Sequence, residues 1–134
     1  MIDVEDAKLL AAARAARENA YAPYSQFRVG AALATRDGRV FAGCNVESQS
    51  YGLTNCAERT AFFAAIAAGV RPGDFAQIAV VGDTVDPIAP CGACRQVMLE
   101  LGGPALVVLQ GNLSSHVKHT TAGALLPGAF VLPV

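Results

Sequence analysis

The stretches Thr54–Arg59 (TNCAER) and Pro90–Arg95 (PCGACR) decide how this chain is interpreted. Each begins a predicted helix, the first over about residues 56–68 and the second over about 91–101, and glycines follow both helices. The N-terminus of a helix carries unpaired backbone N–H groups and the positive end of the helix dipole. The two motifs therefore place thiol groups at two positions that favour negative charge.

The three cysteines of these motifs form a metal-binding pattern. Cys91 and Cys94 are three residues apart, so on the first turn of a helix they share one face and can hold one ion. Cys56 supplies a third thiolate from the other helix. A structural zinc normally has four protein ligands, whereas three ligands leave a coordination position for water. The pattern therefore indicates a catalytic zinc site.

Charged residues beside the cysteines fit the same chemistry. Glu58, two residues after the first cysteine, is the predicted proton carrier between water and substrate. Without a metal nearby, a glutamate in the first turn of a helix would only support the helix dipole. Three thiolates leave a zinc complex with net negative charge. We expect Arg59 and Arg95 to offset that charge by hydrogen bonding to sulfur.

Hydrophobic periodicity and turn signals predict eight elements in the order α, β, β, α, β, α, β, β. Their expected ranges are about 4–20, 27–35, 39–46, 56–68, 78–81, 91–101, 105–109 and 116–120. Asp3 is the predicted N-cap of the first helix, and Asp37-Gly38 predicts a hairpin. The later β–α–β units imply parallel pairing after an antiparallel start. The sequence thus predicts an α/β fold in which a mixed five-stranded sheet carries helices on both faces.

Length and composition restrict the class of protein. The chain has 134 residues, which suits a single domain over residues 1–134. Hydrophobic residues make up 53% and charged residues 16% of it. Two readings are compatible with this apolar composition: an oligomer that buries further surface, or a chain that is merely rich in alanine.

The net charge and the lack of targeting signals restrict the partners and the compartment of the protein. A net charge of −1 gives no electrostatic footprint for nucleic acid, so a small neutral substrate is favoured. No stretch approaches the ~18 uninterrupted apolar residues that a membrane span requires. The first residues are acidic and lack the basic flank of a signal peptide. Four cysteines without such a signal predict a reducing compartment, the cytoplasm.

The chain resembles the small homotetrameric cytidine deaminases. The similarity includes the two zinc motifs and extends over Tyr24–Ala32 (YSQFRVGAA), Asn45–Glu47 (NVE), Ser50–Thr54 (SYGLT) and Leu125–Phe130 (LLPGAF). The zinc motifs alone indicate only the deaminase superfamily, whereas Phe27 with Asn45 and Glu47 narrows the substrate to free nucleosides. The resemblance implies a three-layer fold, one Zn²⁺ per subunit, and hydrolytic deamination of cytidine and 2′-deoxycytidine in pyrimidine salvage.

The resemblance also implies roles for substrate-binding residues. It places Phe27 against the pyrimidine ring, Asn45 and Glu47 on the ribose hydroxyls, and the Ala57 backbone beside the base. A buried carboxylate and amide would discriminate strongly against analogues without those hydroxyls. Judged without the resemblance, Phe27 and Phe130 are more typical of core residues, and Asn45 and Glu47 of a hairpin surface.

Assembly is implied in the same way. In the family, residues that match Tyr51 and Phe130 reach the active site of a neighbouring subunit, so a homotetramer with active sites near its interfaces is expected. The chain departs from the common family pattern at Ser48, Gln49 and Ala124, which leaves fine substrate contacts and subunit packing open.

Other interpretations of the cysteines stay open at this point. The Cys91–Cys94 pair could be a thioredoxin-like redox motif, although that leaves the Cys56–Glu58 motif unexplained. A structural zinc module would use Cys44 as its fourth ligand, but Cys44 has no ligand spacing and suits a buried strand better. Within the deaminases, a nucleotide or an aminonucleoside antibiotic could be the substrate, and the charge of Glu47 argues against a phosphate nearby.

Overall fold

One mixed β-sheet organises the polypeptide, and the computed structural model describes it over residues 4–133. Its strands are β1 (Val29–Thr35), β2 (Val40–Cys44), β3 (Phe75–Gly82), β4 (Val107–Gly111) and β5 (Lys118–Thr121). They lie in the order β2-β1-β3-β4-β5. The β3–β4 pair is parallel and the other three pairs are antiparallel. The predicted mixed five-stranded sheet is confirmed.

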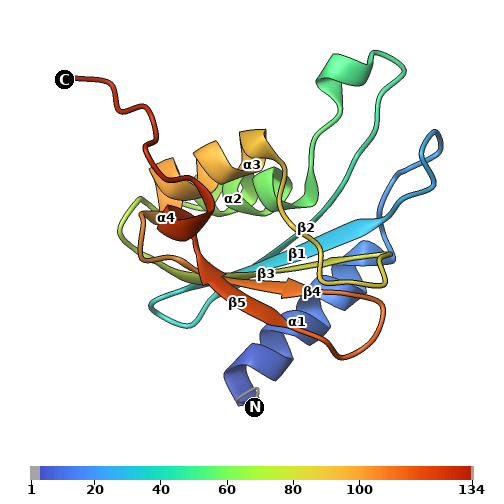
Figure 1. Ribbon diagram of the computed structural model, residues 1–134, viewed down its shortest axis with the longest axis horizontal. Coiled ribbons are helices and arrows are strands. Elements are labelled where there is room, and N and C mark those ends of the chain that lie inside the picture. The colour runs from blue at the N-terminus through green and yellow to red at the C-terminus, as the bar shows by residue number, and fades with distance from the viewer. Residues whose placement is uncertain (1–3, 134) are drawn as a thin grey trace.

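Helices cover both faces of this sheet, as predicted (Figure 1). They are α1 (Val4–Arg17), the 3₁₀-helix η1 (Tyr51–Leu53), α2 (Ala57–Ala67), α3 (Gly92–Val97), the π-helical turn η2 (Met98–Gly102) and α4 (Ala122–Leu125). Helix α1 lies alone on one face, and α2, α3 and α4 lie on the other. Among residues 4–133, no helix is both long and apolar enough to cross a lipid bilayer.

Alternation along the strands explains the two helical layers. Successive side chains of a strand point to opposite faces. In β1, Ala31 and Leu33 pack with α2, whereas Ala32 packs with Leu9 and Leu10 of α1. All of these side chains are buried. Both faces of the sheet are therefore hydrophobic, which requires a helix on each.

Several boundaries differ from the sequence-based expectation. Helix α1 ends at Arg17 rather than at residue 20, and its predicted N-cap, Asp3, lies outside the described residues. The second cysteine helix changes from α- to π-helical hydrogen bonding at Met98. Strand β3 is longer than predicted because Phe75 and Gln77 extend its pairing with β1. The one-turn helix α4 and the 3₁₀-helix η1 were too short to produce a periodic signal.

Two glycines let helices approach the sheet closely. A Cβ atom on Gly43 of β2 would lie 2.5 Å from the Ala57 carbonyl oxygen and 2.5 Å from the Ala61 nitrogen, both in α2. A Cβ on Gly30 of β1 would lie 2.0 Å from the Ala13 carbonyl oxygen in α1. These contacts are to backbone atoms, so neither position accepts a side chain without moving a helix. Gly43 thereby determines where the first turn of α2 lies.

The topology brings the ends of several strands and helices together at one end of the sheet. Val29, at the start of β1, pairs with Gly82, at the carboxyl end of β3. Residues 83–91 connect this end of β3 to α3, and α2 begins nearby on the same face. In α/β sheets, ligands bind beyond the carboxyl ends of parallel strands. The predicted ligands Cys56 and Cys91 lie beside Val29 at this end of the sheet.

Candidate metal centre and active site

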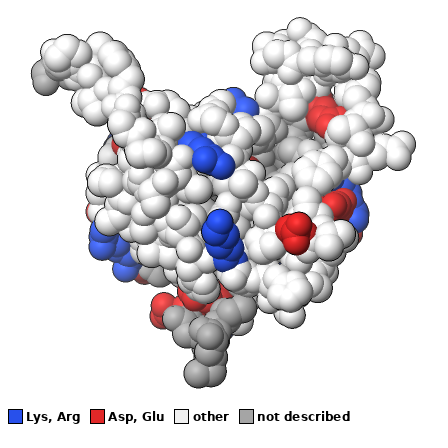
Figure 2. All heavy atoms as spheres, viewed as in Figure 1, with Lys and Arg blue, Asp and Glu red and all other residues white. Residues whose placement is uncertain are grey.

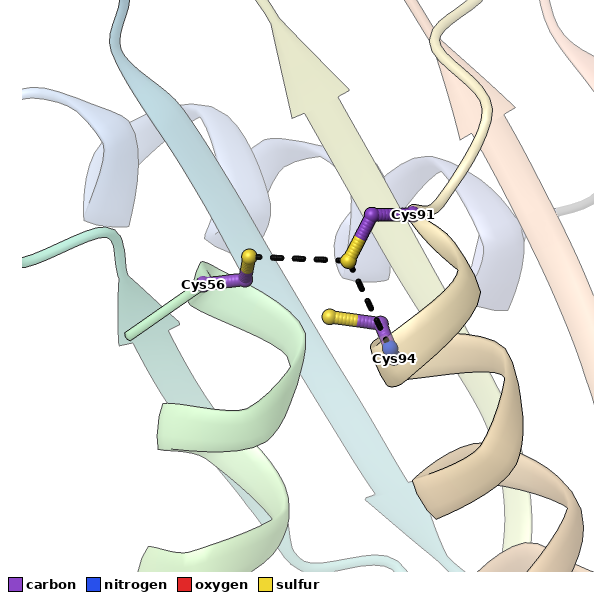
Figure 3. Close-up of side chains that lie close together, drawn as sticks. All are labelled: Cys56, Cys91 and Cys94. Carbon is purple, nitrogen blue, oxygen red and sulfur yellow. Dashed lines mark hydrogen bonds between the residues drawn. The ribbon is translucent and has the colours of Figure 1, made fainter. Parts of the chain in front are cut away.

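The three predicted ligands converge at two helix N-termini. Cys56 is the N-cap residue of α2 and Cys91 is the N-cap residue of α3, with Cys94 in the first turn of α3. Their Sγ atoms lie within 4.8 Å of one another, and the Cys56 and Cys91 sulfurs are 3.7 Å apart (Figure 3). Two sulfurs on a tetrahedral zinc, each ~2.3 Å from the metal, stand about 3.8 Å apart. The arrangement therefore fits a zinc ion.

The fourth cysteine lies outside this group. The Cys44 thiol contacts the Asn19 carbonyl oxygen at 3.6 Å and is not among the clustered ligand atoms. A structural zinc with four cysteine ligands consequently finds no support in the geometry. The thioredoxin-like interpretation is also weakened, because Cys56 lies as close to the CxxC pair as a third metal ligand would.

Donors around the sulfurs favour the thiolate form. The Cys94 backbone N–H donates to Cys91 Sγ at 3.5 Å, and Arg59 Nη2 donates to Cys56 Sγ at 3.3 Å. The pKa of Cys56 falls to about 5, because its thiolate accepts hydrogen bonds from the Cys94 thiol and, more weakly, from Arg59. The hydrogen bond to Cys56, together with burial, raises the pKa of the Cys94 thiol. Negative charge is thus stabilised first at Cys56.

Glu58 lies beside this cluster and is almost completely buried. It is the second residue of α2, and its side chain is 4% exposed. Burial raises the pKa of Glu58 to about 7, and the neighbouring Cys56 thiolate adds to the shift. A carboxyl group with this pKa gains and loses a proton readily near neutral pH, which suits general acid–base catalysis.

A small pocket opens above Glu58 and the cysteines. It has a volume of about 210 Å³ and is lined mainly by apolar side chains. Its lining residues are Phe27, Val29, Asn45, Thr54, Cys56, Ala57, Glu58, Ile88, Ala89 and Cys91. Six residues that the sequence predicted to act in catalysis, metal binding or substrate binding thus line one cavity. They are Phe27, Asn45, Cys56, Ala57, Glu58 and Cys91.

A second hollow adjoins this pocket through Thr54, which lines both. The hollow has a volume of about 400 Å³ and is formed by Tyr24, Ser25, Glu47, Tyr51 and Thr54. The Tyr24 and Tyr51 rings lie 6.2 Å apart, centroid to centroid. Two predicted substrate-binding residues, Glu47 and Tyr51, therefore lie in the hollow rather than in the pocket itself.

The predicted ribose-binding side chains hold the backbone near Phe27. Asn45 accepts a hydrogen bond from the Val29 N–H at 2.9 Å and donates one to the Phe27 carbonyl at 2.8 Å. Glu47 accepts hydrogen bonds from the Tyr24 and Ser25 N–H groups at 3.0 and 3.1 Å and another from the Ser25 hydroxyl. These contacts lower the pKa of Glu47, the hydroxyl contributing most.

Two predicted residues lie away from the pocket within one chain. Arg95 donates to the carbonyl oxygens of Pro90 at 2.8 Å and Leu125 at 3.0 Å, so its described hydrogen bonds are to backbone. Its share in offsetting thiolate charge stays a prediction. Phe130 is 72% exposed and lines a separate apolar groove beside η2. In a single chain this ring does not line the pocket.

Sequence reasoning missed part of the pocket wall. Val29, Thr54, Ile88 and Ala89 line it without belonging to any predicted set of site residues. Ile88 and Ala89 stand in the turn-rich stretch directly before the CxxC motif, and Ile88 N–H bonds to the Gly111 carbonyl at 2.9 Å. The position of Ile88 and Ala89 directly before the helix that carries Cys91 and Cys94 was the signal that could have identified them.

Known proteins are similar to this chain in sequence. Residues 3–110 match the family model of the cytidine and deoxycytidylate deaminase zinc-binding region. The chain is 53% identical over 129 residues to the cytidine deaminase of Sporosarcina psychrophila, covering 96% of this chain and 92% of that protein. It is 57% identical over 115 residues to the cytidine deaminase of Halalkalibacterium halodurans, covering 86% of each.

A solved structure agrees over nearly the whole fold. The 1.6 Å crystal structure of cytidine deaminase from Burkholderia pseudomallei superposes with a TM-score of 0.92 at 68% sequence identity, covering 92% of this chain and 98% of that chain. The resemblance at the level of the family and the fold expected from it are confirmed. The chain therefore belongs to the cytidine and deoxycytidylate deaminase family.

Proposed function

We propose that this protein is a zinc-dependent enzyme that hydrolyses cytidine and 2′-deoxycytidine to uridine and 2′-deoxyuridine with release of ammonia, as in pyrimidine salvage. The observation that carries the proposal is the buried Glu58, with a pKa of about 7, in one small pocket with Cys56 and Cys91. A proton carrier and a metal-binding group are thereby within reach of one bound ring. The names of the relatives support the same reaction.

Three cysteines, Cys56, Cys91 and Cys94, would hold one zinc ion per chain, as the sulfur separations allow. When bound, zinc supplies Lewis-acid activation of a water molecule. The chain supplies the proton transfers. Glu58 accepts a proton from the attacking water and delivers it to N3 of the cytosine ring. After the water oxygen has added to C4, Glu58 takes the second proton of that oxygen and passes it to the amino group, so that the C4–N bond breaks, one water is consumed and one ammonia is released.

The substrate would occupy both hollows. The apolar pocket beside Phe27 and the Ala57 backbone takes the pyrimidine ring, and the adjoining hollow takes the sugar. A carboxylate offers about four lone-pair sites and a carboxamide two donors and two lone pairs. The described hydrogen bonds use three sites of Glu47 and one donor and one lone pair of Asn45. Each side chain retains capacity for a ribose hydroxyl.

A small neutral substrate also suits the surface charge. On the face shown in Figure 2, Lys and Arg side chains are scattered among neutral ones rather than gathered into a basic patch. An ultraviolet assay of zinc-quantified protein on cytidine, 2′-deoxycytidine, CMP and cytosine tests the proposal. We expect turnover of the two nucleosides alone. Faster turnover of CMP would assign a nucleotide substrate, and no turnover of any of the four would contradict the proposed function.

Charge compensation by Arg59 is open to a direct test. We expect Arg59→Gln to lower zinc affinity or kcat by about 10- to 100-fold, because the guanidinium hydrogen bond to the Cys56 sulfur is lost. Zinc content and steady-state kinetics measure the two effects. Arg36→Gln is a matched control, since the Arg36 side chain donates to the Gly73 carbonyl at the far end of β1. Unchanged zinc content and turnover in Arg59→Gln would show that Arg59 does not share the charge.

We infer that the chain, one domain over residues 1–134, assembles as a homotetramer with active sites near the interfaces. Both the η1 segment and the C-terminal segment extend from the body of the fold (Figure 1). Tyr51, Leu53, Phe130 and Leu132 on these segments are 76%, 74%, 72% and 62% exposed. Large apolar side chains at such exposure favour burial against another copy. Sedimentation equilibrium should give about four times the 13.8 kDa chain mass, and a monomer would contradict this.

The proposed compartment is the cytoplasm. All four cysteines are free, and three of them would have to stay reduced to bind zinc. Thiols persist in this state in reducing compartments. Cell fractionation with activity measurement tests the assignment.

A further inference from the structure

Phe27 is held at the mouth of the pocket mainly through its backbone. The ring is 37% exposed, so packing alone does not determine its position. Its edge lies near Gly82, where a Cβ atom would be 3.4 Å from Phe27 Cζ. The preceding residue, Gln26, has φ = 57°, a left-handed conformation that costs energy for a residue with a side chain. A loop in this conformation needs hydrogen bonds to hold it.

Both backbone polar groups of Phe27 have partners connected with the 45–47 segment. The carbonyl oxygen accepts from Asn45 Nδ2 at 2.8 Å. The N–H donates to Ser25 Oγ at 3.0 Å, and the Ser25 hydroxyl donates in turn to Glu47. A hydroxyl has one donor and two lone pairs, so Ser25 can make both bonds at once. The pKa of Glu47 is lowered, mainly because its carboxylate accepts a hydrogen bond from the Ser25 hydroxyl. Since the hydroxyl proton points to Glu47, the lone pairs of the hydroxyl are free to accept from the Phe27 N–H.

We propose that Ser25 is a positioning residue that couples the sugar-binding carboxylate of Glu47 to the base-stacking ring of Phe27. The inference rests on the proposed function and adds a residue to it. Ser25 lies in the hollow next to Glu47, whereas Phe27 lines the neighbouring pocket, so the hydroxyl connects the two halves of the site. When the sugar of a nucleoside binds Glu47, the Phe27 ring is therefore already in position to stack on the base.

The proposal predicts a particular kinetic signature. Stacking on Phe27 contributes equally to the bound substrate and to the transition state, so its loss raises KM with little change in kcat. Ser25→Ala removes both the donor and the acceptor, and we expect KM for cytidine to rise about tenfold while kcat stays within about threefold. Ser25→Thr keeps a hydroxyl and should restore KM to near the wild-type value. Ser114→Ala, at an exposed serine that bonds to Asn112, is the matched control.

A double-mutant cycle separates positioning from general damage. If Ser25 acts through Phe27, the Ser25→Ala substitution should have no further effect on KM in a Phe27→Ala background. Multiplying effects in the double variant would overturn the proposal, because Ser25 would then act independently of the ring. An unchanged KM in Ser25→Ala would overturn it too.

Hydrogen exchange provides a readout that does not depend on activity. The Phe27 amide should exchange faster with solvent in Ser25→Ala and at the wild-type rate in Ser25→Thr, with thermal unfolding and zinc content confirming the fold of each variant. Equal Phe27 exchange in all variants would contradict the proposal. Inactivity of the wild-type protein on every nucleoside would instead contradict the proposed function, and the exchange result would still decide the role of Ser25.

Discussion

Glu58→Gln is expected to lower kcat for cytidine by about 10²- to 10⁴-fold while leaving bound zinc at one ion per chain. Glutamine has nearly the same shape as glutamate but cannot carry a proton between water and the ring. The side chain is 4% exposed and the metal is held by other residues, so the fold and the ligand cluster should survive. Steady-state kinetics with zinc determination measures both quantities.

A control at another glutamate isolates the role of position. Glu100 lies in η2 and contacts Gln96 at 3.1 Å, away from the pocket lining. Glu100→Gln should therefore retain wild-type kcat. Normal turnover by the Glu58 variant would rule out the proton-transfer role, and loss of zinc from it would show that Glu58 supports the metal site instead.

Cys94→Ala is expected to abolish both zinc binding and activity. Cys94 is completely buried in the first turn of α3, and two thiolates cannot hold zinc as three do. A ligand that binds only the folded state stabilises it by about 4 kcal/mol when present at about 1,000 times its Kd. The wild-type melting temperature should therefore fall when zinc is chelated, whereas that of the variant should not respond.

Cys44→Ala is the matched control for the metal site. Cys44 contacts the Asn19 carbonyl and stands outside the sulfur cluster, so this variant should keep full zinc content and activity. Elemental analysis and calorimetry distinguish the two cysteines. Zinc loss from the Cys44 variant would revive the four-cysteine structural site.

Local patterns were enough to predict the ligand-bearing helices. Cys91 and Cys94 lie three residues apart, and this spacing places them on one helix face wherever the helix is located. The start of α2 at the TNCAER motif depends likewise on residues close in sequence. The β-forming residues of 27–35 and 39–46, with the Asp37-Gly38 turn between them, similarly predicted β1 and its hairpin with β2, which the antiparallel register confirms.

Elements that depend on distant partners were predicted less well. The extension of β3 to Phe75 depends on pairing with Thr35 of β1, about forty residues earlier, so no local pattern announces it. The change to a π-helical turn at Met98 likewise has no sequence signal in the apolar run around it. The role of Arg95 in offsetting thiolate charge was inferred from adjacency alone and stays a prediction; its described hydrogen bonds reach the carbonyl oxygens of Pro90 and Leu125.

The sequence by itself determined the family and predicted the zinc ligands and the proton carrier, because each depends on residue types at short fixed spacings. Only the tertiary structure decided how deeply these side chains are buried and which distant residues they contact. It buried Glu58 and thereby raised its pKa to about 7, and it connected Glu47 through Ser25 to Phe27. Burial and long-range hydrogen bonds arise from how strands and helices pack, and packing joins residues whose separation along the chain carries no periodic signal.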